Sequence, residues 1–129
     1  YRLVRGNKME YENKHGLKRT IRGAVRVAMA IAGGAFGEKY KQPKFIENSA
    51  QDSLYRKLTQ MVDEGKFEKA ENILWERAEK KDLLDLQLAA AVYSYMNEKE
   101  DTFIEQSDFS REEIEYGIRC VMNMYGFDA

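Results

Sequence analysis

The chain has 129 residues, of which 43% are hydrophobic and 33% are charged, and its formal net charge at pH 7 is −1. This length suits one domain with a core of its own, and this composition excludes disorder along the whole chain. The single cysteine cannot form a disulfide within the chain. Together with the single histidine it gives too few soft ligands for a zinc site. These features favour a cytoplasmic protein without a metal or other cofactor.

The two parts of the chain carry opposite charge. Residues 1–45 contain eleven Lys/Arg and three Asp/Glu, whereas residues 46–129 contain ten Lys/Arg and nineteen Asp/Glu. Such an asymmetry bears on partners and assembly more than on the fold. We therefore divide the chain into a basic N-terminal arm, residues 1–45, and an acidic helical body, residues 46–129.

An amphipathic helix is predicted from about Tyr11 to Phe36. Apolar residues recur at steps of three and four and form one face of it: Leu17, Ile21, Ala24, Val25, Ala28, Ala32 and Ala35. Basic residues recur beside them at helical spacing: Lys18, Arg19, Arg22 and Arg26. Glycines at positions 33, 34 and 37 weaken the helix and end it, and residues 38–48 around Pro43 form a linker.

A helical hairpin is predicted over residues 50–80. Ser49 is placed to cap its first helix, which ends near Glu64, and Gly65 supplies a left-handed turn. The next helix begins near Phe67, so the connection is short enough to make the two helices antiparallel. Trp75 lies outside the main apolar face of this helix, and we expect it to pack against the first or the fourth helix or to mark an interface.

Two further helices are predicted in the acidic body. Residues 83–97 are apolar most of the way round, which is typical of a central helix. Residues 98–108 read as an acidic loop pinned by Phe103 and Ile104. The last helix, residues 110–125, begins with a capping box of Ser110 and Glu113.

The run from Leu58 to Leu74 resembles one tetratricopeptide repeat. Gly65, Phe67 and Ala70 stand at the steps that such a repeat uses for its turn, for filling the hairpin and for close approach of its helices. The sequence departs from the repeat at Arg77, where a small residue is expected, and no second copy follows at a period of about 34 residues. The resemblance implies a hairpin whose apolar face other helices, or a second chain, must cover.

Residues 52–127 are similar to an uncharacterised family of small helical bacterial proteins. The similarity lies in two segments, DSLYRKLTQMVDEGKFEKAENILWERAE and DFSREEIEYGIRCVMNMYGF. It implies the fold and no activity. The expected fold is therefore all-α, with about five helices, in which a tetratricopeptide-like antiparallel hairpin packs with a central apolar helix and a C-terminal helix.

No group of residues predicts an enzyme. Carboxylates gather around the hairpin turn, at Asp63, Glu64, Glu68 and Glu71, and we interpret them as a solvated face. Phosphate-loop, nucleophile-elbow and dinucleotide motifs are absent from the sequence. We therefore expect no catalytic, cofactor-binding or metal-binding residues.

The basic helix carries the functional prediction. It is an ordinary solvated face or pairs with the acidic body of its own chain or of a partner, or it lies on an anionic membrane surface, or it touches nucleic acid, which is the weakest interpretation. The favoured function is a non-enzymatic protein-interaction or scaffolding module with an unknown protein partner; the alternative is membrane or nucleic-acid binding through residues 17–36. We also expect a homodimer in which this helix contributes to the interface. The expected interaction residues are Lys18, Arg19, Arg22, Arg26, Ile21, Val25 and Trp75.

Overall fold

The structure is a computed structural model that describes residues 8–33 and 49–127. Side chains are described from His15 onward in the first segment and from Ala50 onward in the second. Over this part of the chain it contains six α-helices and no strand, which confirms the all-α prediction. The helices are α1 (Lys8–Gly33), α2 (Ser49–Asp63), α3 (Phe67–Ala78), α4 (Leu83–Asn97), α5 (Asp101–Gln106) and α6 (Arg111–Met124).

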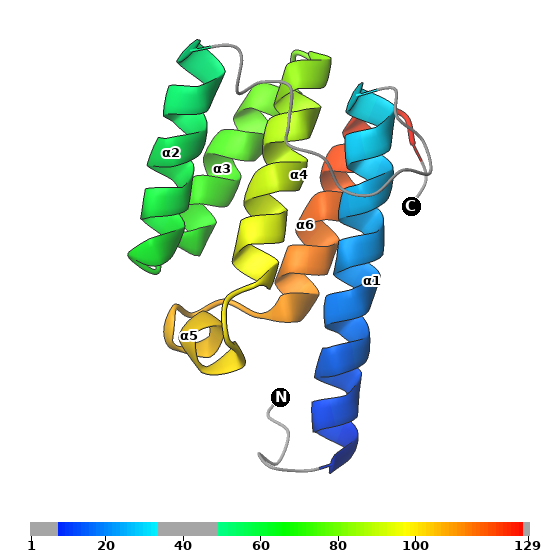
Figure 1. The fold of residues 1–129 in the computed structure, drawn as a ribbon, viewed down its shortest axis with the longest axis vertical. Coiled ribbons are helices and arrows are strands. Elements are labelled where there is room, and N and C mark those ends of the chain that lie inside the picture. Colours follow the sequence, from blue (N-terminus) through cyan, green and yellow to red (C-terminus); the bar gives the residue numbers. More distant parts are fainter. Residues whose placement is uncertain (1–7, 34–48, 128–129) are drawn as a thin grey trace.

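In chain order α1, α2, α3, α4 and α6 run alternately up and down, so the neighbours α1 and α6 point the same way (Figure 1). The short α5 crosses the end where α4 stops and α6 starts. Helix α4 lies in the middle and contacts α1, α2, α3 and α6. Its sequence explains this position, because every residue from Asp85 to Tyr93 is buried. The prediction of a central helix over residues 83–97 is confirmed. Asp82 begins it, since its side chain accepts a hydrogen bond of 2.8 Å from the amide of Leu84.

Helix α1 is part of the same hydrophobic core. Ile21 and Ala28 have no exposed surface and Val25 is 3% exposed, because this face of α1 packs on α4 and α6. The boundary that we placed at residue 45 therefore does not separate two cores. Within the described residues α1 begins at Lys8, earlier than expected, and runs to Gly33. The predicted end at Phe36 and the linker around Pro43 lie outside the described residues.

Gly65 makes the turn between α2 and α3, as predicted. Its φ is +80°, and the amide of Lys66 reaches back to the carbonyl of Met61 at 2.8 Å, which closes the end of α2. Arg77 stands where the tetratricopeptide pattern expects a small residue, and its side chain forms hydrogen bonds between helices. It donates to Asp85 at 2.8 Å and to Gln51 at 2.9 Å, and so joins α3 to α4 and α2.

The expectation of a loop over residues 98–108 is wrong, because residues 101–106 form α5. The two apolar residues do anchor this segment. Ile104 is 1% exposed, and the ring of Phe103 lies 6.0 Å from the ring of Phe67. Since Phe103 and Ile104 are adjacent in sequence, a helical turn is what lets both reach the core.

Ser110 caps α6, as predicted: its hydroxyl accepts a hydrogen bond of 3.1 Å from the amide of Glu113. Replacing Ser110 with alanine should lower the free energy of unfolding by about 1 kcal/mol, because a first-turn amide loses its acceptor. Thermal and urea unfolding would measure this. Ser53→Ala, at an exposed site inside α2, is the control and should not destabilise the protein. If Ser110→Ala and the wild type had the same free energy of unfolding, the cap would not contribute to stability.

Candidate functional site

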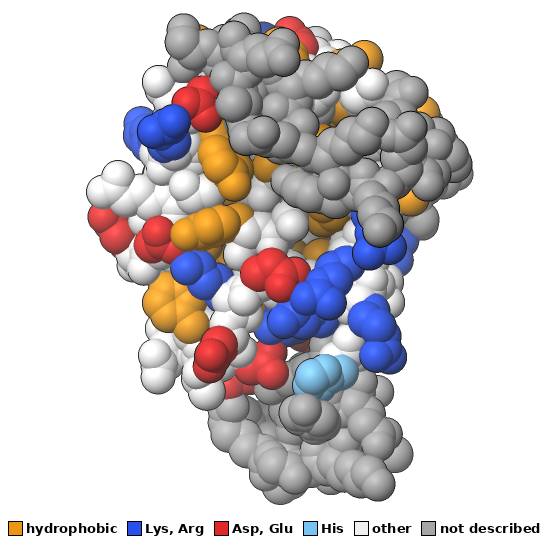
Figure 2. All heavy atoms as spheres, viewed as in Figure 1, with side chains coloured by type: hydrophobic (Ala, Val, Ile, Leu, Met, Phe, Trp, Pro, Cys, Tyr) orange, Lys and Arg blue, Asp and Glu red, His pale blue; other side chains and the backbone are white. Residues whose placement is uncertain are grey.

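The outer face of α1 carries a line of basic side chains. His15, Arg19, Arg22 and Arg26 follow one another at steps of four, three and four residues, and all four are exposed. We call these four residues the basic row; Lys18 lies beside it and is partly buried. Figure 2 shows cationic side chains gathered over α1, with the histidine below them. Four of the seven expected interaction residues therefore lie together on one surface.

Part of this charge is used within the chain. Arg22 donates to both carboxylate oxygens of Glu98, at 2.9 Å each, and the Nζ atom of Lys18 lies 4.0 Å from the same group. The hydrogen bond from Arg22 holds the pKa of Glu98 below its usual value. Arg19 and Arg26 form no ion pair with another described residue. The charges of Arg19 and Arg26 are therefore directed outward, to the solvent.

Two expected interaction residues lie on the opposite side of α1. Ile21 and Val25 are covered by α4 and α6 of their own chain. In this arrangement they are core residues and present no surface to a partner. The apolar face and the basic face of α1 are thus separated, the first turned inward and the second outward.

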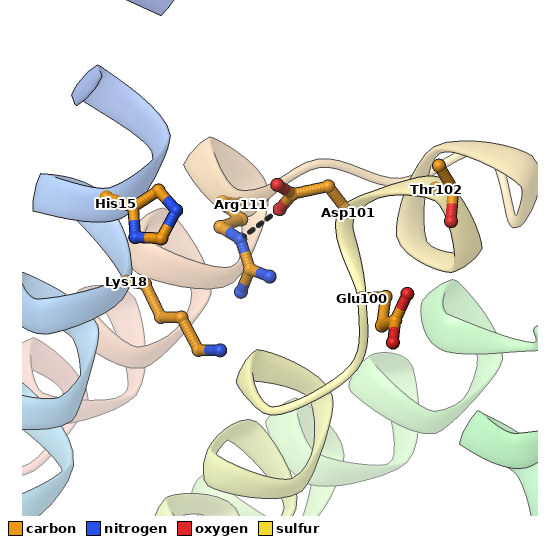
Figure 3. Close-up of a pocket in the computed structure, with 6 residues that line it drawn as sticks. All are labelled: His15, Lys18, Glu100, Asp101, Thr102 and Arg111. Carbon is orange, nitrogen blue, oxygen red and sulfur yellow. Dashed lines mark hydrogen bonds and ion pairs between the residues drawn. The ribbon is translucent and has the colours of Figure 1, made fainter. Parts of the chain in front are cut away.

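A pocket of about 320 Å³ adjoins the lower end of the basic row. It is lined by His15, Lys18, Glu100, Asp101, Thr102 and Arg111. In Figure 3 the two residues of α1 face the start of α5, and Arg111 lies between the two sides. The pocket therefore has basic side chains on one wall and carboxylates on the other.

Arg111 belongs to the framework of this pocket. It is 6% exposed, and each of its three nitrogens donates: to Asp101 at 2.7 Å, to the carbonyl and side chain of Asn97 at 2.6 and 2.9 Å, and to the carbonyl of Lys99 at 2.8 Å. Asn97 in turn donates to the carbonyl of Lys18 at 3.0 Å. This network fastens α6 and α5 to the end of α4 and to α1, so Arg111 has little capacity left for a ligand.

Neither Arg111 nor Asn97 was predicted from the sequence as a functional residue. A signal was present, because Arg111 stands three residues before Ile114 and seven before Ile118, on the buried stripe of α6. A charged residue in register with a buried stripe predicts an internal ion pair or hydrogen-bond network.

Trp75, the last expected interaction residue, is partly buried and packs towards α4, one of its two expected neighbours. Its indole donates a hydrogen bond of 3.0 Å to the hydroxyl of Tyr93, which donates at 2.7 Å to Glu71. Burial raises the pKa of Glu71, the hydrogen bond from Tyr93 opposes this, and the carboxylates of Glu113 and Glu68 add to it. Burial also raises the pKa of Tyr93 well above its usual value. The phenol therefore stays protonated and acts as a donor.

Glu71→Gln should raise the free energy of unfolding at pH 7. Glutamine keeps an acceptor for Tyr93 and removes a charge that burial and two carboxylates disfavour. Because the folded-state pKa of Glu71 is raised, this residue costs stability as pH rises through its titration range, so the gain should shrink below about pH 4. Urea unfolding at both pH values would measure it. Glu76→Gln, at an exposed site on the same helix, is the control and should change stability little. A less stable Glu71→Gln variant at pH 7 would contradict the argument.

The four carboxylates near the hairpin turn do not share one site. Asp63 accepts from Tyr95 at 2.7 Å and from Lys99 at 2.6 Å, and these two hydrogen bonds lower its pKa. Glu71 points instead to Tyr93, between α3 and α6. Over residues 8–33 and 49–127 no three His, Cys, Asp or Glu side chains are arranged to hold a metal ion. In the same part of the chain, none of the helices combines the length and the hydropathy of a membrane span.

Comparison with known proteins gives a family and no activity. Residues 11–126 match the model of a family of unknown function, DUF6483. The match includes most of α1, so the helix that bears the basic row lies within the family's domain. No curated protein and no solved structure matches the chain. Because the family model spans most of its length, the chain belongs to the DUF6483 family of unknown function.

Proposed function

We propose that this protein is a non-enzymatic interaction module whose basic row on α1 binds an acidic surface of another protein chain. The observation that supports this is the division of α1 into two faces. Its apolar face is satisfied by the core, whereas Arg19 and Arg26 point outward and have no ion pair with another described residue. Exposed charges of this kind steer and orient partners more than they stabilise a fold.

Three observations favour a protein partner over a membrane or a nucleic acid. A helix lying in a membrane surface buries its apolar face in lipid, and here α4 and α6 cover that face. The exposed positions of α1 from His15 onward include no Phe, Tyr or Trp side chain on which a base could stack. Glu98 and Glu100 also lie beside the basic row, and they repel an extended polyanion.

We further propose that the α2–α3 hairpin is tetratricopeptide-like and acts as a scaffold. Phe67 and Ala70 have no exposed surface, as their assigned places in such a repeat require. Its open side is covered by α4, and α6 also packs on α3. The hairpin then supports α4, on which α1 packs with its basic row facing outward.

A fluorescein-labelled helical peptide with glutamates at steps of three and four residues would test the proposed function. At low salt the wild type should bind it, and Arg19→Glu/Arg26→Glu should bind at least about tenfold more weakly, a loss of about 1.4 kcal/mol. Arg56→Glu/Lys57→Glu on α2 changes the net charge equally and should leave the affinity unchanged. Fluorescence anisotropy is the measurement.

The same titration with duplex DNA and with anionic vesicles separates the alternatives. If either binds through Arg19 and Arg26 while the peptide does not, the proposal of a protein partner is wrong. Equal weakening by the α1 and α2 variants would show that net charge, and not the basic row, controls binding.

A further inference from the structure

An acidic surface lies where α3 and α6 begin. Glu68 stands in the first turn of α3, Glu112 and Glu113 stand in the first turn of α6, and Asp108 precedes α6 in the chain. All four side chains are exposed. We call these four residues the acidic patch.

The carboxylates of the acidic patch act on one another. Burial raises the pKa of Glu113, the hydrogen bond with Ser110 opposes this, and the carboxylates of Asp108, Glu68 and Glu112 add to the rise. None of the four forms an ion pair with another described residue. The patch therefore gathers like charges with which no cation in the described part of the chain forms an ion pair.

The basic row offers what the acidic patch lacks. Arg19 and Arg26 are seven positions apart, which corresponds to about 10 Å along a helix, and both guanidinium groups point to water. A guanidinium group can give two parallel hydrogen bonds to a carboxylate. A helix face that brings two such groups to the patch relieves the repulsion within it. The acidic patch is thus a surface of the kind that the basic row is proposed to bind.

The basic row cannot serve the acidic patch of its own chain. Helices α4 and α6 lie between α1 and α3 (Figure 1). Glu113 of α6 lies close enough to Glu68 of α3 for their charges to interact. Among the described residues, Glu98 is the acid that pairs with the row, through Arg22. A second copy of the chain has no such restriction. With a net charge of −1, two copies also repel each other little at neutral pH.

We propose that the basic row of one copy docks on the acidic patch of a second copy. This inference rests on the proposed function of α1 and names its partner. One contact leaves a basic row free on one copy and an acidic patch free on the other. Such a head-to-tail contact builds open chains or rings, whereas the sequence predicts a homodimer.

Ion pairs between exposed side chains are weak and are screened by salt. The association should therefore be weak and should depend on ionic strength. By sedimentation velocity, the average mass should rise with protein concentration at about 10 mM salt, where the Debye length is about 30 Å. At about 1 M salt, where it is about 3 Å, the protein should sediment as a monomer.

Two neutralised variants test the pairing itself. Arg19→Gln/Arg26→Gln removes the outward charges of the basic row, and Glu68→Gln/Asp108→Asn/Glu112→Gln removes most of the acidic patch. Each variant alone should sediment as a monomer at low salt. An equimolar mixture should form one-to-one pairs and nothing longer, because the intact row of one variant meets the intact patch of the other and both remaining surfaces are blocked.

Controls separate this contact from effects of folding and of net charge. Circular dichroism checks that both variants are folded, and their one-to-one pairing would itself show that each keeps a working surface. Arg56→Gln/Lys57→Gln on α2 changes the net charge as much as the row variant does, and it should associate like the wild type.

Three results would overturn this inference: a wild type that stays monomeric at low salt at all concentrations, a mixture that does not associate, or an α2 control that loses association as fully as the row variant. The proposed function fails separately. If the labelled acidic peptide binds the basic row of a protein that never self-associates, the row serves an acidic helix of a different protein. If the protein neither self-associates nor binds the peptide, both proposals fail.

Discussion

Replacing Arg111 with methionine is expected to lower the free energy of unfolding by about 3 kcal/mol, at the lower end of what the loss of one partner from a buried ion pair costs. The methionine fills much of the same volume but donates nothing. The carbonyls of Asn97 and Lys99 then lose their donor in a buried site, whereas Asp101, which is 36% exposed, can turn to water. Urea unfolding followed by circular dichroism would measure the loss.

Arg119 is the matched control for this experiment, because it lies on the same helix and pairs with Glu115 at 2.9 Å on the surface. Arg119→Met should cost no more than about 0.5 kcal/mol. Arg111→Lys keeps the charge but loses the planar fork, so it should recover only part of the stability. A loss at Arg111 no larger than that at Arg119 would show that the network contributes little.

Replacing Gly117 with alanine is expected to destabilise the protein, although the same change stabilises most helices. Gly117 lies within α6, and a Cβ atom placed on it would collide with the carboxylate of Glu71 and the ring and hydroxyl of Tyr93. Those two groups are hydrogen-bonded to each other and packed between α3, α4 and α6, so neither can withdraw without breaking a buried contact. Overpacking of this kind costs about 1–3 kcal/mol.

The same replacement at Gly23, on another helix, is expected to have the opposite effect on stability. Gly23 lies inside α1, and a Cβ atom there would meet nothing within 4 Å. Gly23→Ala should therefore raise the free energy of unfolding by about 0.5–1 kcal/mol, the difference in helix propensity between the two residues. Thermal unfolding of the two variants should move the melting temperature in opposite directions. If both rise, the slot at Gly117 is not tightly filled.

The ends of several helices could be predicted because their signals are local. Ser110 caps α6 through an amide three residues away, and Gly65 takes the left-handed conformation that ends α2. The central position of α4 could also be predicted, since a helix without a polar face has to be surrounded by other helices. These features depend on neighbours in sequence or on composition, and both can be seen without a structure.

The networks could not be predicted, because they join residues far apart in the chain. Arg22 meets Glu98 across 76 positions, and Asn97 meets the backbone of Lys18 across 79. The sequence shows that α1 has a basic face but not which acid lies beside it. The acidic composition of residues 98–108 similarly concealed α5, whose formation depends on two apolar residues reaching the core under α3.

The place of α1 in the core has a consequence for biosynthesis. Helix α1 is made before α4 and α6, the two helices on which it packs. Its partner α4 is complete only after about 60 more residues, a delay of several seconds at roughly 5–20 residues per second. Until then Ile21 and Val25 have no surface to pack on, and the nascent helix shows water both its apolar and its basic face. The growing chain therefore exposes apolar surface that the finished protein buries.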